Sequence, residues 1–256
     1  MIEKKELEEL AGLNGLRPWQ QEKHYIQAVT LGILADQPLV FKGGTYLWFF
    51  HGLPRFSEDL DFTAKEKLRE DIAGHVSRSL ELVGIRNSHK TITDNGTTLS
   101  FRVSAKGPLN TRSIDECRVY VEISKREQAE KKAVPMKLDF PAYNIPTKRV
   151  PGMALEEVAA EKARAIMTRD KARDIFDLGY LIEKKNVAFS KGLIQKKLAF
   201  YSMKFSEKEF LEKAMQKEKN YEKELKGMVF AELGGFGKTM HVIKKWAGAE
   251  KQFPAI

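Results

Sequence analysis

Two aspartates, Asp59 and Asp61, stand one residue apart in FSEDLDFTA, a segment in which polar and apolar residues alternate. In a β-strand residues i and i+2 lie on one face, so both carboxylates would project together while Leu60 and Phe62 turn toward the core. Adjacent carboxylates suit Mg²⁺, which takes one or two protein carboxylates and fills its other positions with water and substrate phosphates. A solvated strand face would show the same pattern, so a second feature is needed to indicate a metal site.

The glycine pair Gly43 and Gly44 provides that feature. It follows the apolar segment PLVFK, expected to form a strand, and precedes a helix expected to begin at Thr45. Backbone N–H groups at a helix N-terminus bind phosphate, and glycine permits close approach, although a tight strand-to-helix turn also favours glycine. The two features together predict a triphosphate bound at Gly43, Gly44 and Thr45, beside a metal held by the two aspartates.

The stretch KGGTYLWFFHGLPRFSEDLDF resembles the first motif of the nucleotidyltransferase fold, in which a hydrophobic segment with two small residues precedes Asp-hydrophobic-Asp. Its sequence pattern from Gly52 to Phe62, G-L-x-R-x-S-x-D-L-D-F, is similar to that of the AbiEii-type toxins of abortive-infection and toxin–antitoxin systems. Fourteen residues separate Gly44 from Asp59, slightly more than is usual in the wider superfamily, and we interpret this as a longer connecting helix. The resemblance implies an α+β, polymerase-β-like mixed sheet with helices.

The same resemblance implies a third metal-binding carboxylate on a neighbouring strand. Glu122 lies in the alternating segment RVYVEI, and the SKRE that follows it also resembles the family. Asp139, in KLDF, is the alternative. A strand-face charge paired with a lysine would equally account for either residue.

A second stretch of resemblance, Leu155–Leu181, is similar to the family pattern in which a helix containing Glu-Lys is followed by R-x-x-x-R-D-h-x-D-L. It implies catalytic roles for Lys162, Asp174 and Asp177. Lys162 would offset charge on the β and γ phosphates as a point charge. Asp174 and Asp177 would share one helix face, where either residue would orient Lys162 or position the attacking hydroxyl.

The remaining chain predicts the elements that position these residues. Helical spacing indicates helices over Pro18–Ala35 and Lys65–Val83. Three or four strands are expected, around Ile85–Ile92, Thr98–Ser104, Arg118–Ser124 and Val134–Phe140. Helix-forming residues dominate after Pro146–Gly152. We therefore expect an α/β nucleotidyltransferase domain over residues 1–150 and a helical domain over residues 151–256 that contributes to the active site.

The composition is that of a soluble globular protein, with 42% hydrophobic and 31% charged residues among 256. No apolar run approaches the roughly 20 residues that span a bilayer, and the start MIEKKELEEL is not typical of a signal peptide. We expect a cytoplasmic protein that does not contact membranes. The single cysteine, Cys117, excludes an internal disulfide and a cysteine-rich zinc site.

The chain carries 44 Lys and Arg against 35 Asp and Glu, a net charge of +9, which suits a phosphate-rich partner or simply maintains solubility. Arg55, Arg169 and Arg173 are assigned to RNA binding or to structure. The resemblance implies a toxin that uses an NTP and one or two Mg²⁺ ions to add nucleotides to RNA, with the tRNA 3′ end as the expected acceptor, and a cognate antitoxin as partner. We expect a monomer. Transfer to a protein or small-molecule hydroxyl and a non-catalytic RNA- or antitoxin-binding module are the alternatives.

Overall fold

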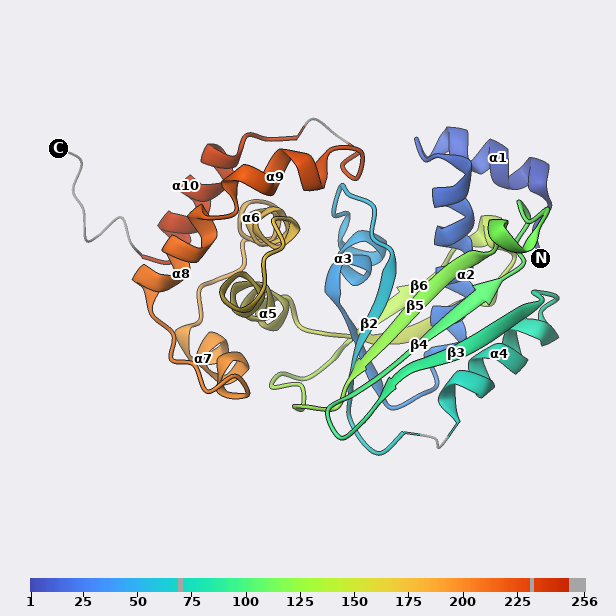
Figure 1. Ribbon diagram of the computed structural model, residues 1–256, viewed down its shortest axis with the longest axis horizontal. Coiled ribbons are helices and arrows are strands. Elements are labelled where there is room, and N and C mark those ends of the chain that lie inside the picture. The colour runs from blue at the N-terminus through green and yellow to red at the C-terminus, as the bar shows by residue number, and fades with distance from the viewer. Residues whose placement is uncertain (69–70, 231–232, 249–256) are drawn as a thin grey trace. The chain divides into compact units, whose positions relative to one another are not determined.

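The computed structural model describes residues 1–68, 71–230 and 233–248, and its helices and strands are shown in Figure 1. Strands are concentrated in the first three fifths of the chain, and helices dominate the remainder. Within the described ranges, no helix is long and apolar enough to cross a lipid bilayer.

The chain forms two compact units. The first contains Met1–Gly52 and Phe56–Met153, and the second contains Leu53–Arg55 and Ala154–Ile256. The second unit therefore includes three residues from the middle of the segment that connects the glycine pair to the aspartates.

The described part of the first unit is built on a seven-stranded sheet with the order β3-β4-β5-β2-β1-β7-β6 (Figure 1). Its strands are β1 Leu39–Lys42, β2 Asp59–Ala64, β3 Asn87–Asp94, β4 Thr98–Ala105, β5 Cys117–Ser124, β6 Val134–Leu138 and β7 Lys148–Gly152. β2 pairs in parallel with β5 and antiparallel with β1, whereas β1 pairs in parallel with β7. The predicted mixed sheet with helices is confirmed.

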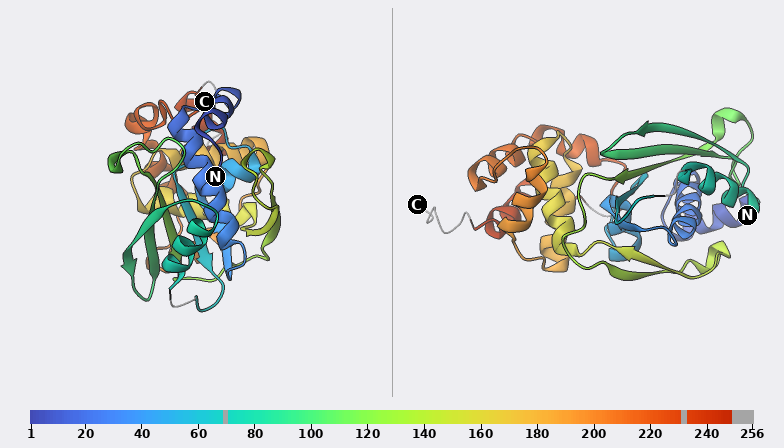
Figure 2. Two further views of the ribbon diagram at one scale, coloured as in Figure 1. Left: turned by 90° about the vertical axis from the view of Figure 1, so that its right-hand side faces the viewer. Right: turned by 90° about the horizontal axis from the view of Figure 1, so that it is seen from below.

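Helices cover this sheet. They are α1 Lys4–Leu13, α2 Pro18–Leu34, α3 Gly43–His51 and α4 Ile72–Leu82, with short 3-10 turns at Ser113–Asp115 and Pro141–Tyr143. α2 packs against β2, β5 and β7, and α4 packs against β3 and β4 (Figure 2). α3 follows β1 without a connecting residue and lies against β1 and β2, so the glycine pair is held next to the strand of the aspartates.

Two predicted helix boundaries are wrong. The helix expected from Thr45 begins at Gly43, because the glycine pair forms its first turn rather than a separate turn before it. The helix expected over Lys65–Val83 is α4, which begins at Ile72, where the side chain of Asp71 caps it by accepting a hydrogen bond from Gly74 N at 2.9 Å. Residues 69 and 70 of that predicted helix lie outside the described residues.

The segment Pro146–Gly152, at which the composition predicts the domain boundary, contains β7. Its Lys-Arg-Val-Pro-Gly sequence lacks the β-branched alternation by which strands are recognised. Pairing with β6 provides the missing support, since Pro151 lies opposite Pro135 and Val150 lies opposite Met136. β7 also pairs with β1 through Phe41 and Gly152, so tertiary contacts override the weak local preference.

The second unit is helical. Its helices are α5 Leu155–Thr168, α6 Arg173–Lys185, α7 Lys191–Ala199, α8 Glu207–Met215, α9 Glu218–Leu225 and α10 Phe236–Trp246. α5 contacts α6, α7 and α8, which explains why it is buried on nearly all sides. Polar residues on such a helix require partners on its neighbours.

Candidate active site

A row of polar residues crosses the central strands of the sheet. The register places Glu122 of β5 beside Asp61 of β2, and it places Lys42 of β1 on the other side of Asp61. Residues paired in this way lie on one face of a sheet, with strands about 4.8 Å apart. Asp59 lies on the same face because it is two residues from Asp61. Asp59 and Asp61 are half-buried and Glu122 is exposed, so three carboxylates share this face.

Buried apolar residues hold these carboxylates in place. Leu60 and Phe62 of β2 are 0% and 1% exposed, and Val121 and Ile123 of β5 are both fully buried. Shifting either strand by one residue would move carboxylates into the core, so the apolar alternation fixes the register. The predicted orientation of Leu60 and Phe62 is confirmed.

Gly43 brings the start of α3 against Asp61. Its φ angle is +80°, and a Cβ atom at this position would lie 2.2 Å from Oδ2 of Asp61. Every other residue type would therefore collide with the carboxylate and strain the backbone. Lys42, the N-cap residue, makes no side-chain capping hydrogen bond to the helix. The positive end of α3 thus lies beside the carboxylate of Asp61.

Thr45 has a structural role that the sequence did not reveal. Its side chain is fully buried, and its hydroxyl donates a hydrogen bond to the backbone carbonyl of Asp59 at 2.5 Å. This bond connects α3 to the first residue of β2. The hydroxyl is therefore committed to the strand, and phosphate binding at Gly43, Gly44 and Thr45 would use backbone N–H groups.

The donors of this face fit a Mg²⁺ ion that arrives with a nucleotide. Within residues 1–68, 71–230 and 233–248, no group of three or more His, Cys, Asp or Glu side chains lies close enough together to hold a metal ion. Asp59, Asp61 and Glu122 form an open row instead. Mg²⁺ needs only one or two protein carboxylates when phosphates and water complete its shell.

Asp139, the alternative third carboxylate, lies elsewhere. It is exposed, follows β6 at the edge of the sheet, and is separated from β2 by β7 and β1. Three strand spacings correspond to about 14 Å. Its carboxylate pairs with Lys137 and accepts a hydrogen bond from Thr147 at 3.0 Å, and the hydrogen bond from Lys137 is the main reason that the pKa of Asp139 is lowered. The structure therefore places Glu122, and not Asp139, next to Asp61.

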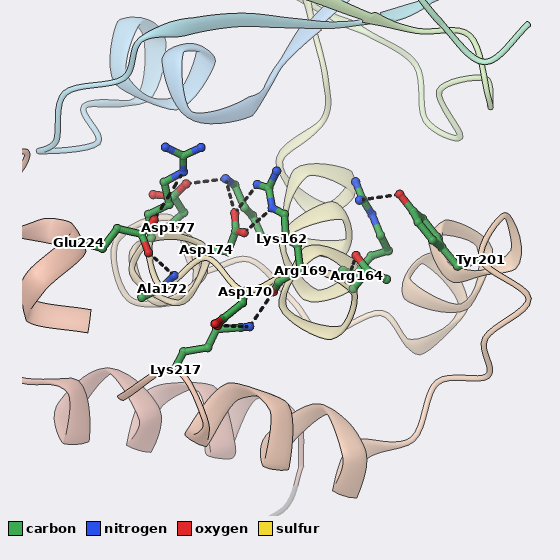
Figure 3. Close-up of polar contacts among 12 residues, drawn as sticks. Lys162, Arg164, Arg169, Asp170, Ala172, Asp174, Asp177, Tyr201, Lys217 and Glu224 are labelled. Atoms are coloured by element: carbon green, nitrogen blue, oxygen red, sulfur yellow. Dashed lines mark hydrogen bonds and ion pairs between the residues drawn. The ribbon is translucent and has the colours of Figure 1, made fainter. Parts of the chain in front are cut away.

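The predicted residues of the second unit form a buried ion network. Arg55 binds Asp177 through two hydrogen bonds of 2.6 Å each, from Nε and Nη2. Nζ of Lys162 lies 2.5 Å from Asp177 and 3.1 Å from Asp174 (Figure 3). Both aspartate side chains are fully buried, and Lys162 is 6% exposed. Lys162 is therefore oriented by both aspartates, which is one of the two roles that the sequence left open for them.

Arg169 connects the two central helices of this unit. It is the C-cap residue of α5, and its guanidinium donates two hydrogen bonds of 2.8 and 2.9 Å to Asp174 in the first turn of α6 (Figure 3). The backbone carbonyl of Arg169 accepts a hydrogen bond from Lys217 at 2.7 Å. Arg173 forms a longer ion pair of 3.9 Å with Glu224 of α9. Arg169 thus ties α5 to α6, as one of its two predicted roles requires.

Electrostatics keep the two aspartates ionised. Burial raises the pKa of both carboxyl groups, but the neighbouring cations outweigh it. Lys162 and Arg169 lower the pKa of Asp174, and Arg55 and Lys162 lower the pKa of Asp177. Two buried carboxylates therefore share three cations, so the network stabilises the ionised form.

Sequence reasoning missed two charged groups. Lys42 stands beside Asp61 and is 7% exposed, and the only available signal was its place immediately before the glycine pair. Lys197 of α7 is fully buried, with Nζ 2.7 Å from Glu157 and 3.5 Å from Glu161 of α5. The spacing of four between the two glutamates places them on one face of the helix, but their partner lies far along the chain.

Comparison with known proteins assigns the chain to a family. Residues 33–240 match the family described as "Nucleotidyl transferase AbiEii toxin, Type IV TA system". No curated protein matches the chain.

Solved structures with the same fold include the following three. The chain is similar to JHP933 from Helicobacter pylori, with a TM-score of 0.60 at 23% identity over 91% of this chain and 94% of that one. A putative nucleotidyltransferase from H. pylori gives 0.60 at 23% identity over 92% and 99%. MenT4, a nucleotidyltransferase toxin from Mycobacterium tuberculosis, gives 0.68 at 18% identity over 100% and 91%. The family match includes the glycine pair, the acidic row and the buried ion network, and the chain therefore belongs to the AbiEii family of nucleotidyltransferase toxins of type IV toxin–antitoxin systems.

Proposed function

We propose that this nucleotidyltransferase transfers a nucleotidyl group from an NTP to the 3′ hydroxyl of an RNA, with the tRNA 3′ end as acceptor, in a reaction that depends on Mg²⁺. One observation carries the proposal. Asp59, Asp61 and Glu122 lie on one sheet face, and Asp61 lies against the N-terminus of α3 at Gly43. This arrangement supplies carboxylates for a metal and backbone donors for phosphates within one short region.

The residues of this region have separate tasks in the proposed reaction. Asp59 and Asp61 would hold one or two Mg²⁺ ions, which supply charge neutralisation and align the reacting oxygens. Backbone N–H groups at Gly43 and Gly44 bind the phosphates of the NTP. The acceptor oxygen bonds to the α-phosphorus, the bond to pyrophosphate breaks, and pyrophosphate leaves with the electron pair. Glu122, exposed beside Asp61, accepts the proton of the attacking hydroxyl.

The proposal also includes roles in nucleotidyl transfer for Lys162, Asp174 and Asp177. Their contacts within the second unit already account for their burial and charge. Lys162→Met tests the two roles separately, because Arg55 and Arg169 would still neutralise the aspartates. A loss of transfer far larger than the loss of stability would support a role for the lysine in the reaction, whereas equal losses would restrict it to structure.

The charge distribution supports a polyanionic acceptor. The sequence of the second unit contains 22 Lys and Arg against 15 Asp and Glu, a net charge of +7 out of the +9 of the whole chain. Basic surfaces bind nucleic acid mainly through phosphates. The same charge does not favour a small uncharged acceptor, so we place transfer to a protein or small-molecule hydroxyl second.

Membership of a type IV toxin–antitoxin family implies an antitoxin as partner. We propose that the cognate antitoxin neutralises growth inhibition by this enzyme, and that the enzyme acts as a cytoplasmic monomer. Co-expression with the neighbouring reading frame tests the first point. Restored growth would support it, and continued inhibition would contradict it.

Incubation with each of the four α-labelled NTPs, Mg²⁺ and a tRNA pool tests the reaction. We expect label in the RNA with wild-type protein, and none with Asp59→Asn. Asp94→Asn is the matched control, because Asp94 is also a strand aspartate of the first unit but pairs with Lys125 at 2.9 Å. Label confined to protein or to small molecules would contradict the RNA acceptor. Full growth inhibition by Asp59→Ala would contradict the enzymatic proposal.

A further inference from the structure

The acidic face of the sheet continues, on the side away from Gly43, into a group of basic and aromatic residues. The register places Tyr120 of β5 beside Asp59, Arg102 of β4 beside Tyr120, and Lys90 of β3 beside Arg102. Arg118 shares this face because it lies two residues before Tyr120. We call Lys90, Arg102, Arg118 and Tyr120 the basic face.

The cations of the basic face have no acidic partner. Within the described ranges, with their gaps at 69–70, 231–232 and 249–256, the side chains of Lys90, Arg102 and Arg118 make no ion pair and no hydrogen bond. Nε of Arg102 is buried and lacks an acceptor. Some exposed cations of this unit are paired, as Lys125 is with Asp94 and Lys148 is with Asp36.

This arrangement of cations destabilises the fold. Like charges that lie directly opposite on neighbouring strands repel each other, and Lys90 is directly opposite Arg102. A buried donor without an acceptor adds a desolvation penalty. The cations therefore do not stabilise the unit by themselves, and a bound anion would relieve both penalties.

Tyr120 identifies the kind of anion. Its side chain is 38% exposed although it lies in the middle of a sheet, next to Asp59. An exposed aromatic ring beside cations is the combination by which proteins bind single-stranded nucleic acid, with bases stacked on the ring and phosphates on the cations. Two strand spacings separate Tyr120 from Lys90, so the basic face extends over roughly 10 Å, enough for more than one phosphate.

We propose that the basic face binds the 3′-terminal nucleotides of a single-stranded RNA acceptor, with a base on Tyr120 and phosphates on Arg102 and Arg118. This inference rests on the proposed function, since it assigns the acceptor to one side of Asp59 and Asp61 and the NTP to the side of Gly43. The carboxylates then lie between the two substrates, as transfer from one to the other requires.

Equilibrium binding of a fluorescent single-stranded 12-nucleotide RNA, without NTP, tests the inference. The variant Arg102→Gln/Arg118→Gln removes two charges from the basic face. Arg78→Gln/Arg112→Gln is the matched control, because it removes two exposed arginine charges that pair with Asp71 and Asp115. Tyr120→Leu removes the aromatic ring and keeps an apolar side chain.

We expect Arg102→Gln/Arg118→Gln to weaken RNA binding by tenfold or more and to reduce the slope of log K against log salt by about 1.4, since each phosphate contact contributes about 0.7 for single strands. Tyr120→Leu should weaken binding by about tenfold. The control should bind as the wild type does, and KM for the NTP should be unchanged in every variant.

Other outcomes would overturn the inference. Equal weakening in the control would show that only net charge matters, and a raised KM for the NTP with unchanged RNA binding would assign the basic face to the NTP. Wild-type protein that binds RNA through these residues but does not label it would refute the proposed function while the basic face stands. Labelled RNA with variants that bind as the wild type would refute the basic face while the function stands.

Discussion

Two groups of carboxylates in this protein, Asp59 and Asp61 on β2 and Asp174 and Asp177 on α6, occupy different environments. The pair on β2 is half-buried, with Gly43, Lys42 and an exposed Glu122 beside Asp61. The pair on α6 is fully buried and is surrounded by Arg55, Lys162 and Arg169. Spacing in the sequence brings each pair to one face of its element, yet the two pairs differ in burial and in their neighbours.

The difference shows how neighbouring residues determine the environment of a carboxylate. Burying an ion pair costs desolvation energy that only close cations and hydrogen bonds offset, and the α6 pair has both. At β2 a side chain at position 43 would collide with the Asp61 carboxylate, so glycine allows α3 to begin against it. In the proposed reaction a cation that arrives with the nucleotide acts at β2, whereas the cations of α6 belong to the chain itself.

A variant of Asp61 gives the strongest test of the difference between the two pairs. Asp61→Asn should lower the rate of nucleotidyl transfer by about 1,000-fold, a loss typical of removing a group that stabilises transition-state charge. Its free energy of unfolding should fall by less than that of Asp177→Asn, because Asp61 is half-buried whereas Asp177 is fully buried. Single-turnover rates and urea unfolding measure the two effects. Transfer above a tenth of the wild-type rate would contradict this assignment.

Asp177→Asn should produce the opposite result. It leaves Arg55 and Lys162 with one carboxylate fewer in a buried site, so we expect the free energy of unfolding to fall by about 3–5 kcal/mol. Asp170→Asn is the control, since Asp170 is exposed and lies 3.5 Å from Lys217. It should cost less than about 1 kcal/mol. Similar losses in both variants would remove the distinction between the buried network and the surface.

Variants of Glu122 and Asp139 test which residue of the first unit is the third carboxylate. Glu122→Gln should lower the transfer rate about 100-fold, because general-base catalysis contributes roughly this much. Asp139→Asn should leave the rate unchanged, since Asp139 lies at the other edge of the sheet. Rates measured at saturating NTP and RNA decide between them, and a larger loss in Asp139→Asn would reverse the assignment of the third carboxylate.

The smallest effect concerns pH. Asp174 and Asp177 have lowered pKa values in the folded protein, so the unfolded chain binds protons first as the pH falls below about 4. Their contribution to stability is present above the unfolded pKa and is lost as the pH falls through the folded pKa. Asp177→Asn should therefore reduce the slope of unfolding free energy against pH by up to about 1.4 kcal/mol per unit between pH 4 and 3. Parallel slopes in urea unfolding would contradict the lowered pKa of Asp177.

Local patterns predicted the parts of the fold that depend on local periodicity. The alternation around Asp59 and Asp61 identified β2 and its outward face, and the same pattern identified β5 with Glu122. β7 escaped prediction because it owes its structure to pairing with β1 and β6. A segment of charges, proline and glycine has no strand signal of its own.

Contacts between distant parts of the chain also limit how much of the site the sequence can predict. Spacing predicted that Asp59 and Asp61 share a face, but the placement of Glu122 next to Asp61 comes from pairing between strands 61 residues apart. Arg55 and Asp177 are 122 residues apart, so neither periodicity nor spacing connects them. The contact of Thr45 with the Asp59 carbonyl has no sequence signal either.

Because Leu53–Arg55 belong to the second unit, two uninterrupted segments of the gene cannot encode the two units separately. These three residues interrupt the chain of the first unit, yet Arg55 completes the ion network of the second, and Phe230 N donates to the Pro54 carbonyl at 2.9 Å. A gene fragment that begins at residue 154 would encode every helix of the second unit but not its buried guanidinium. No single cut in the coding sequence can therefore release two complete units, and gene fission or domain exchange at the end of β7 would leave Asp177 without its strongest partner.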